Sequence, residues 1–129
     1  MIGHISRALL ALLFVAAGVN HFVSPAPYIA IVPPFLPWPE ALVYLSGIAE
    51  IAGGLGILWP RTRRLAGWGL IALLVAVFPA NIYAAFAGME LGGRTVPAWM
   101  LWVRLPLQAL LIAWVYRAGL TRNAEASQP

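Results

Sequence analysis

The 129-residue chain contains no cysteine and no lysine, and only 9% of its residues are charged. The lack of cysteine excludes an internal disulfide, a thiol relay and a cysteine-ligated metal. The scarcity of charge, together with 62% hydrophobic residues and a mean hydropathy of +0.85, lies outside the usual range of soluble proteins. The composition therefore indicates a membrane protein, and the length fits four crossings of ~20 residues with short connections.

The sequence also lacks a phosphate-binding loop, a nucleophile triad and a cluster of carboxylates, so no catalytic class has motif support. Whether the protein is an enzyme is left open. The formal charge of +4 comes from arginines that stand mostly beside apolar segments. Such placement is a signal of membrane topology before it is one of polyanion binding. The expected partner is therefore the lipid bilayer and not nucleic acid.

Four apolar segments are long enough to cross a bilayer as helices. They cover approximately residues 5–23, 40–59, 65–87 and 97–117. The expected fold is all-α, a bundle of four transmembrane helices that forms a single membrane domain over residues 1–129, with a flexible tail at 118–129. The first segment is long for a signal peptide and lacks a small-x-small cleavage site, so we expect it to be retained.

Two of the connections have a distinctive composition. Residues 24–39 contain six prolines and are otherwise largely apolar. Because proline interrupts helices, this stretch predicts a proline-rich non-helical loop between the first two spans, lying in the interface or over the mouth of the bundle. Residues 61–64 contain three arginines and predict a very short basic turn between the second and third spans.

The arginines predict the orientation of the bundle. Arg94 is the only loop arginine on one side of a four-span arrangement. The other side has Arg7, Arg61, Arg63, Arg64, Arg117 and Arg122. The positive-inside rule then places both termini in the cytoplasm, so that the protein is N-in and C-in.

Glu50 lies near the middle of the second predicted span. A charge at that depth costs at least ~2.5–3.5 kcal/mol, so its side chain should face a partner or a water-filled cavity and not lipid. Arg104 in the fourth span has the same cost, and we expect the two to form an ion pair. Ser46 and Gln108, each one helical turn away, could satisfy the remaining donors and acceptors.

The other polar residues of the spans fall in the same, outer half of the bundle. They are Asn20 and His21 in the first span and Asn81 and Tyr83 in the third. If the helix rotations permit, all eight residues meet in one polar pocket beneath the proline-rich loop. His21 is either a proton carrier or a histidine that binds a backbone carbonyl. One histidine and one glutamate do not form a closed ligand set, so no metal site is expected.

Small residues repeat at every fourth position of the third span. They are Ala72, Ala76, Ala80, Ala84 and Gly88. Small residues at this spacing allow another helix to approach closely, so the repeat predicts tight packing along the whole span.

Three short motifs stand around the proline-rich loop and the basic turn. They are Gly-Val-Asn-His-Phe at 18–22, Leu-Ser-Gly-Ile-Ala-Glu-Ile-Ala-Gly-Gly at 45–54 and Phe-Pro-Ala-Asn-Ile-Tyr at 78–83. Together they resemble the DoxX-like family of small four-helix integral membrane proteins. The resemblance implies a multi-pass protein of the bacterial inner membrane. It also implies a link to redox chemistry, since relatives include a subunit associated with thiosulfate:quinone oxidoreduction and partners of oxidative-stress enzymes.

Three functions are compatible with these observations. The first is an accessory or subunit of a membrane redox pathway, with a redox enzyme as partner and a pocket around Glu50 and Arg104 that binds a quinone or a small oxyanion. The second is a non-catalytic assembly protein in which the same two residues only fix helix packing. The third is a small transporter, disfavoured because the inner half offers no polar continuation. No cofactor is identified beyond the quinone, and a homo-oligomer is left open.

Overall fold

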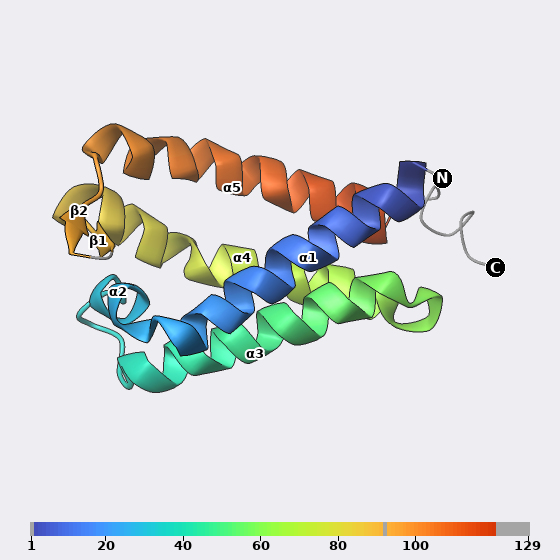
Figure 1. The fold of residues 1–129 in the computed structure, drawn as a ribbon, viewed down its shortest axis with the longest axis horizontal. Helices are drawn as coiled ribbons and strands as arrows, with labels where there is room; N and C mark the ends of the chain where they lie inside the picture. Colours follow the sequence, from blue (N-terminus) through green and yellow to red (C-terminus); the bar gives the residue numbers. More distant parts are fainter. Residues whose placement is uncertain (1, 92, 121–129) are drawn as a thin grey trace.

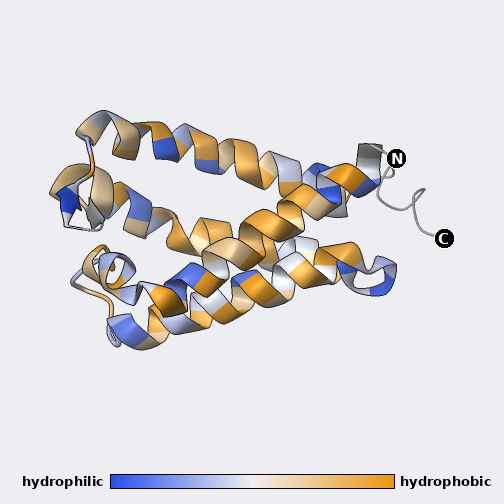
Figure 2. Ribbon diagram, viewed as in Figure 1, coloured by the Kyte–Doolittle hydropathy of each residue, from blue (hydrophilic) through white to orange (hydrophobic). Residues whose placement is uncertain are grey.

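The computed structural model describes residues 2–91 and 93–120, which are mostly helical (Figure 1). The four long helices are α1 (Ile2–Val23), α3 (Pro39–Leu58), α4 (Pro60–Ala87) and α5 (Ala98–Gly119). Each is long and apolar enough to span a membrane, and apolar residues predominate along all four in Figure 2. The predicted helical class with four helices long and apolar enough to cross a membrane is confirmed, and this indicates a multi-pass membrane protein.

The long helices are arranged as two pairs. α1 packs along α3 and α5 packs along α4, and α3 and α4, which are separated only by Trp59, also pack against each other. Near the chain termini, Arg7 Nε donates to the Ala118 carbonyl at 3.0 Å and Trp114 Nε1 donates to Ser6 Oγ at 2.7 Å. These bonds between α1 and α5 join the two pairs at one end of the molecule (Figure 1).

The prediction of a non-helical loop between α1 and α3 is wrong for six of its residues. Pro25–Ala30 forms a short helix, α2. Pro25 and Pro27 fit there because they occupy the first turn, where backbone N–H groups have no acceptor within the helix. Residues 31–38 lie outside helices and lead into α3, which begins at Pro39.

The prediction of a basic turn at residues 61–64 is also wrong, because these residues belong to the start of α4. Pro60 opens that helix at a position that suits proline. The side chain of Arg63 is turned inward, with Nε donating to the Ile57 carbonyl at 2.9 Å and Nη2 donating to the Leu58 carbonyl at 3.3 Å. The last carbonyls of α3 lack partners within their own helix, so the guanidinium completes that helix end and complements its dipole.

A two-stranded hairpin connects α4 to α5. Strand β1 (Glu90–Leu91) pairs antiparallel with β2 (Arg94–Thr95). At the other end of α5, the helix continues to Gly119, so the tail predicted for 118–129 begins inside a helix. The rest of that tail, from residue 121 and including Arg122, lies outside the described residues.

Two apolar clusters hold the helices together. The larger contains Leu10, Phe14, Ile57, Leu70, Leu74, Val115 and Ala118. The smaller joins the loop before α3 to α4, α5 and the hairpin, and contains Ile31, Ala84, Ala85, Met89 and Leu101. Because lipid tails are as apolar as these side chains, close packing and interhelical hydrogen bonds carry much of the association in a membrane.

Glycine sets the distance between α1 and α3. A Cβ on Gly18 would lie 2.6 Å from the carbonyl oxygen of Gly47 and 2.7 Å from Ile51 Cγ1. A Cβ on Gly47 would lie 2.9 Å from His21 Cβ. The two backbones therefore approach closely at the level of His21, and no side chain at either position could replace hydrogen without moving a helix.

The alanine repeat of α4 packs over only part of its length, so the prediction of tight packing along the whole helix is wrong. Ala84 is fully buried and Ala80 packs against the smaller cluster. Ala72 is exposed, Ala76 is exposed where it lines a cavity, and a Cβ on Gly88 would meet nothing within 4 Å. The first half of α4 buries a different face, which contains Gly67, Leu70 and Leu74.

Candidate functional site

A cavity of about 490 Å³ lies between the two helix pairs and is lined by all five helices and the loop before α3. Leu74 of the larger apolar cluster and Ile31 of the smaller one both line it, so the cavity separates the clusters. Its volume lies within the roughly 300–1,000 Å³ of typical small-molecule sites. Most of the lining is apolar, and the polar side chains that reach it are His21, Tyr28, Ser46, Glu50, Asn81, Arg104 and Gln108.

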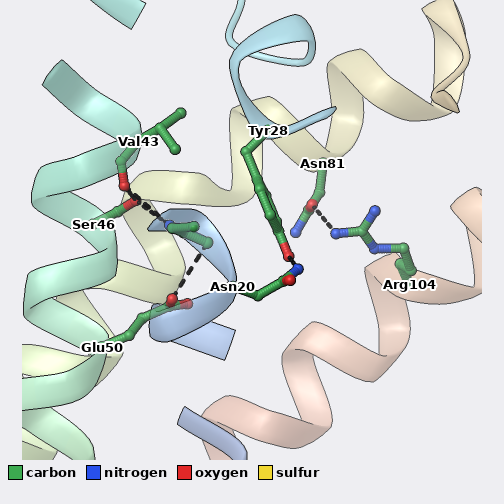
Figure 3. A network of polar contacts seen from close by, with 8 residues as sticks. Asn20, Tyr28, Val43, Ser46, Glu50, Asn81 and Arg104 are labelled. Atoms are coloured by element: carbon green, nitrogen blue, oxygen red, sulfur yellow. Dashed lines mark hydrogen bonds and ion pairs between the residues drawn. The ribbon is translucent and has the colours of Figure 1, made fainter. Parts of the chain in front are cut away.

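His21 makes the polar contacts on the α1–α3 side, and its partners are labelled in Figure 3. Its Nδ1 lies 3.0 Å from the Val43 carbonyl oxygen and 3.1 Å from Ser46 Oγ, and the Ser46 hydroxyl donates to the same carbonyl at 2.9 Å. On the far side of the ring, Nε2 lies 3.4 Å from Glu50 Oε2. Both side chains of this pair are largely buried, at 10% and 15% exposure.

The spacing of the α3 residues explains why they meet one imidazole. Val43, Ser46 and Glu50 are three and four residues apart and therefore share one face of the helix. Gly18 and Gly47 bring α1 against that face, as described above. The histidine thus binds a backbone carbonyl, one of the two roles that its position at the end of the first span had allowed.

Tyr28 of α2 covers the imidazole of His21. The ring centroids are 4.2 Å apart and the ring planes are tilted by 43°. Asn20 Nδ2 donates to the Tyr28 hydroxyl at 2.6 Å and so fixes the end of the side chain. In Figure 3 the tyrosine stands between Glu50 on one side and Asn81 and Arg104 on the other.

The second polar group joins α4 to α5. Arg104 Nη2 donates to Asn81 Oδ1 at 3.0 Å, and Arg104 Nη1 contacts Met89 Sδ at 3.3 Å. The same asparagine donates through Nδ2 to Gln108 Oε1, and Gln108 Nε2 donates to the Leu74 carbonyl. This carbonyl lies in the turn before Pro79, so the glutamine supplies a side-chain donor close to the point where the proline interrupts the helix ladder.

The predicted ion pair between Glu50 and Arg104 is wrong. Within the described residues the carboxylate contacts His21, and the guanidinium contacts Asn81 and Met89. The reason is the order of helices in the bundle, because Glu50 faces the neighbouring α1 whereas Arg104 faces the neighbouring α4. The two charges line one cavity but belong to different helix pairs.

Two other residues predicted for the pocket do not line it. Asn20 donates a hydrogen bond to the hydroxyl of Tyr28, which does line the cavity. Tyr83 packs against the smaller apolar cluster. Among residues 2–91 and 93–120 no group of three His, Cys, Asp or Glu side chains could hold a metal ion.

The comparison with protein families gives one match. The profile of a family described as Domain of unknown function (DUF8561) matches residues 10–119. The chain belongs to this family. No curated protein and no solved structure matches it. The DUF8561 region contains every residue that lines the cavity as well as the glycines that bring α1 against α3.

Two side chains and two backbone carbonyls of this DUF8561 site were missed from the sequence. The proline-rich, apolar composition of residues 24–39 did not single out Tyr28, although a loop folded over the bundle mouth would present it to the cavity. Met89 gave no signal, because its role depends on where the chain turns after α4. The carbonyl acceptors of Val43 and Leu74 are invisible in any sequence, since every residue has one.

Proposed function

We propose that the protein is an accessory or subunit of a membrane redox pathway, of DoxX type and located in the bacterial inner membrane, and that its cavity binds a quinone. The observation that carries the proposal is the environment of Arg104. Within the described residues its two contacts use two of five N–H donors, and neither partner is a carboxylate. A permanently charged, planar donor therefore faces a largely apolar cavity.

A quinone combines the two properties of this cavity. Its flat apolar ring suits walls such as Val77, Leu107 and Leu111, and its carbonyl oxygens suit the free N–H donors of Arg104. A small oxyanion would also accept from the guanidinium but would leave the apolar walls unused. The resemblance to DoxX-like proteins supports the redox setting, where a redox enzyme would be the partner.

The first test is the extraction of bound lipophiles. The protein is purified in mild detergent and its organic extract is analysed by mass spectrometry, and we expect a quinone at a fixed ratio to protein. Ala76→Trp, which places a large side chain on the cavity wall, should remove it. Val75→Trp is the matched control, because the preceding residue is 59% exposed and does not line the cavity. A quinone content that is the same in both variants would contradict the proposal.

A non-catalytic assembly role is the second candidate, and a specific observation favours it. The bonds from Asn81 to Gln108 and from Gln108 to the Leu74 carbonyl join α4 to α5 without any ligand. In this alternative, replacing both Glu50 and Arg104 by Gln leaves pathway activity intact. Loss of activity in that double variant, with its melting temperature retained, would exclude a purely structural role.

The orientation is also a proposal, with both termini in the cytoplasm. It is supported by the start of α4 lying at the same end as the end of α5, where Arg64 Nη1 contacts the Leu120 carbonyl at 3.5 Å. Since the chain has no cysteine, Thr95→Cys and Arg61→Cys each introduce a single thiol. In intact spheroplasts, a membrane-impermeant maleimide should label Thr95→Cys and not Arg61→Cys. The reverse labelling pattern would show that both termini lie outside the cytoplasm and would contradict the proposed orientation.

A further inference from the structure

The contacts of His21 fix where its protons lie. The Val43 carbonyl can only accept, so a hydrogen bond to it at 3.0 Å requires a proton on Nδ1. The Ser46 hydroxyl already donates to that carbonyl, and its oxygen can accept from the same Nδ1–H. Both contacts on this side of the ring are satisfied by a proton on Nδ1.

The opposite side of the ring then needs a second proton. A neutral imidazole protonated on Nδ1 has only a lone pair on Nε2, and Nε2 lies 3.4 Å from Glu50 Oε2. Two acceptors facing each other in a largely buried site would repel. One proton therefore lies in this contact, either on Nε2 as imidazolium and carboxylate or on Glu50 as neutral imidazole and carboxylic acid. The pair has no net charge in either form, which suits a low-dielectric surrounding.

His21 and Glu50 both line the cavity, so the pair borders it. The contact of 3.4 Å is longer than the ~2.7–2.9 Å of a closed charge-assisted hydrogen bond, and Glu50 Oε2 is buried without a hydrogen-bond partner of good geometry. A bound molecule would reach the pair through the surfaces of His21 and Glu50 that line the cavity, since Oε2 itself is buried. Among the described residues, the other titratable or charged groups facing this contact are Tyr28 from α2 and, across the cavity, Arg104 from α5.

We infer that the His21–Glu50 pair is the proton-donating end of the cavity, and that it holds the second oxygen of a ligand whose first oxygen is held by Arg104. This inference rests on the proposed function and narrows its ligand to a flat lipophile with two separated oxygen acceptors. An inorganic oxyanion is disfavoured, because its charge would face the Glu50 carboxylate. The quinone class has the required pair of carbonyls, one for each end of the cavity.

The direction of the pH dependence follows from the proton count. The protonated pair is neutral and donates to the ligand, whereas the deprotonated pair carries one negative charge and repels a carbonyl oxygen. Raising the pH should therefore weaken binding, by up to about tenfold per pH unit once the pair has lost its proton. In that range binding takes up one proton, so the measured heat should depend on the ionisation enthalpy of the buffer.

The test uses decylubiquinone and calorimetric titration of the detergent-solubilised protein, over about three pH units around neutrality and in two buffers. For the wild type we expect an affinity that falls as the pH rises and a heat that depends on the buffer. Glu50→Gln should still bind decylubiquinone, but its affinity should not fall with pH and its heat should not depend on the buffer. Glu40→Gln is the matched control, because Glu40 is exposed in the first turn of α3 and does not line the cavity. Inorganic sulfate should not compete with the quinone.

The outcomes separate the inference from the function on which it rests. If decylubiquinone does not bind at any pH, the proposed function fails. If it binds with the same affinity at every pH, or if Glu50→Gln keeps the wild-type slope, quinone binding stands and the proton-donating role of the pair is overturned. The wild-type titration in two buffers decides the question even if Glu50→Gln does not fold. Competition by sulfate would overturn the ligand class.

Discussion

Replacing Gly18 by alanine should destabilise the bundle more than the same substitution at any other described glycine. The new Cβ would lie 2.6 Å from the Gly47 carbonyl oxygen and 3.1 Å from the Ile51 backbone nitrogen. Neither atom is the movable end of a side chain, so α1 must move away from α3. Overpacking of this kind costs about 1–3 kcal/mol in free energy of unfolding.

The control for this prediction is Gly69→Ala in α4. A Cβ at Gly69 would meet nothing within 4 Å, and alanine in a helix interior is favoured over glycine by about 0.5–1 kcal/mol. Thermal unfolding in detergent should therefore show a lowered midpoint for Gly18→Ala and an unchanged or raised midpoint for Gly69→Ala. Equal midpoints for the two variants would mean that α1 and α3 are not in the close contact described.

The movement of α1 has a consequence at the cavity. His21 lies one turn beyond Gly18 and reaches Val43, Ser46 and Glu50 only because the helices are close. Gly18→Ala should therefore weaken quinone binding as well as stability, although it places no atom in the cavity.

Arg104→Gln should produce a large loss of quinone affinity. The substitution removes the charged fork but keeps a side chain that can reach Asn81. A hydrogen bond to a charged group contributes about 1.5–3 kcal/mol, which corresponds to a rise in Kd of roughly 10- to 150-fold. Arg104→Lys keeps the charge without the planar fork, and we expect an intermediate loss. The affinities of the wild type, Arg104→Gln and Arg104→Lys are measured by titration with decylubiquinone.

Arg94→Gln is the matched control for Arg104→Gln. Arg94 lies on the exposed strand β2 and does not line the cavity, so its loss should leave the affinity unchanged. If both substitutions weaken binding equally, the effect reflects net charge or attraction to the membrane surface and not a contact inside the cavity. A melting temperature that remains near the wild-type value is required for either comparison.

The secondary structure was largely predictable from the sequence. Long apolar runs have few alternatives to membrane-spanning helices, and this holds for all four spans. The errors lie at proline and at helix ends. Pro25 and Pro60 begin helices because they occupy first turns, where proline costs no hydrogen bond. A count of prolines cannot distinguish a helix start from a break.

The sequence predicted the level of the polar residues in the bundle but not which of them contact each other. Hydropathy and the ~1.5 Å rise per residue place polar side chains at a level in the bundle, and Glu50 and Arg104 both line the cavity at that level. Which residues touch depends on the order and rotation of the helices, which hydropathy does not encode. Glu50 contacts His21 because Gly18 and Gly47 allow α1 and α3 to approach closely. That close approach could be read only from coordinates.

Photoaffinity labelling shows directly whether a quinone occupies the cavity between the two helix pairs. A photoreactive short-chain quinone is applied to membranes containing the protein, and the labelled residues are mapped by mass spectrometry. We expect labels near His21, near Glu50 and near Arg104, all suppressed by excess decylubiquinone. Labels on exposed apolar residues outside the cavity, such as Leu12, Leu65 and Leu110, unaffected by the competitor, would contradict quinone binding in the cavity.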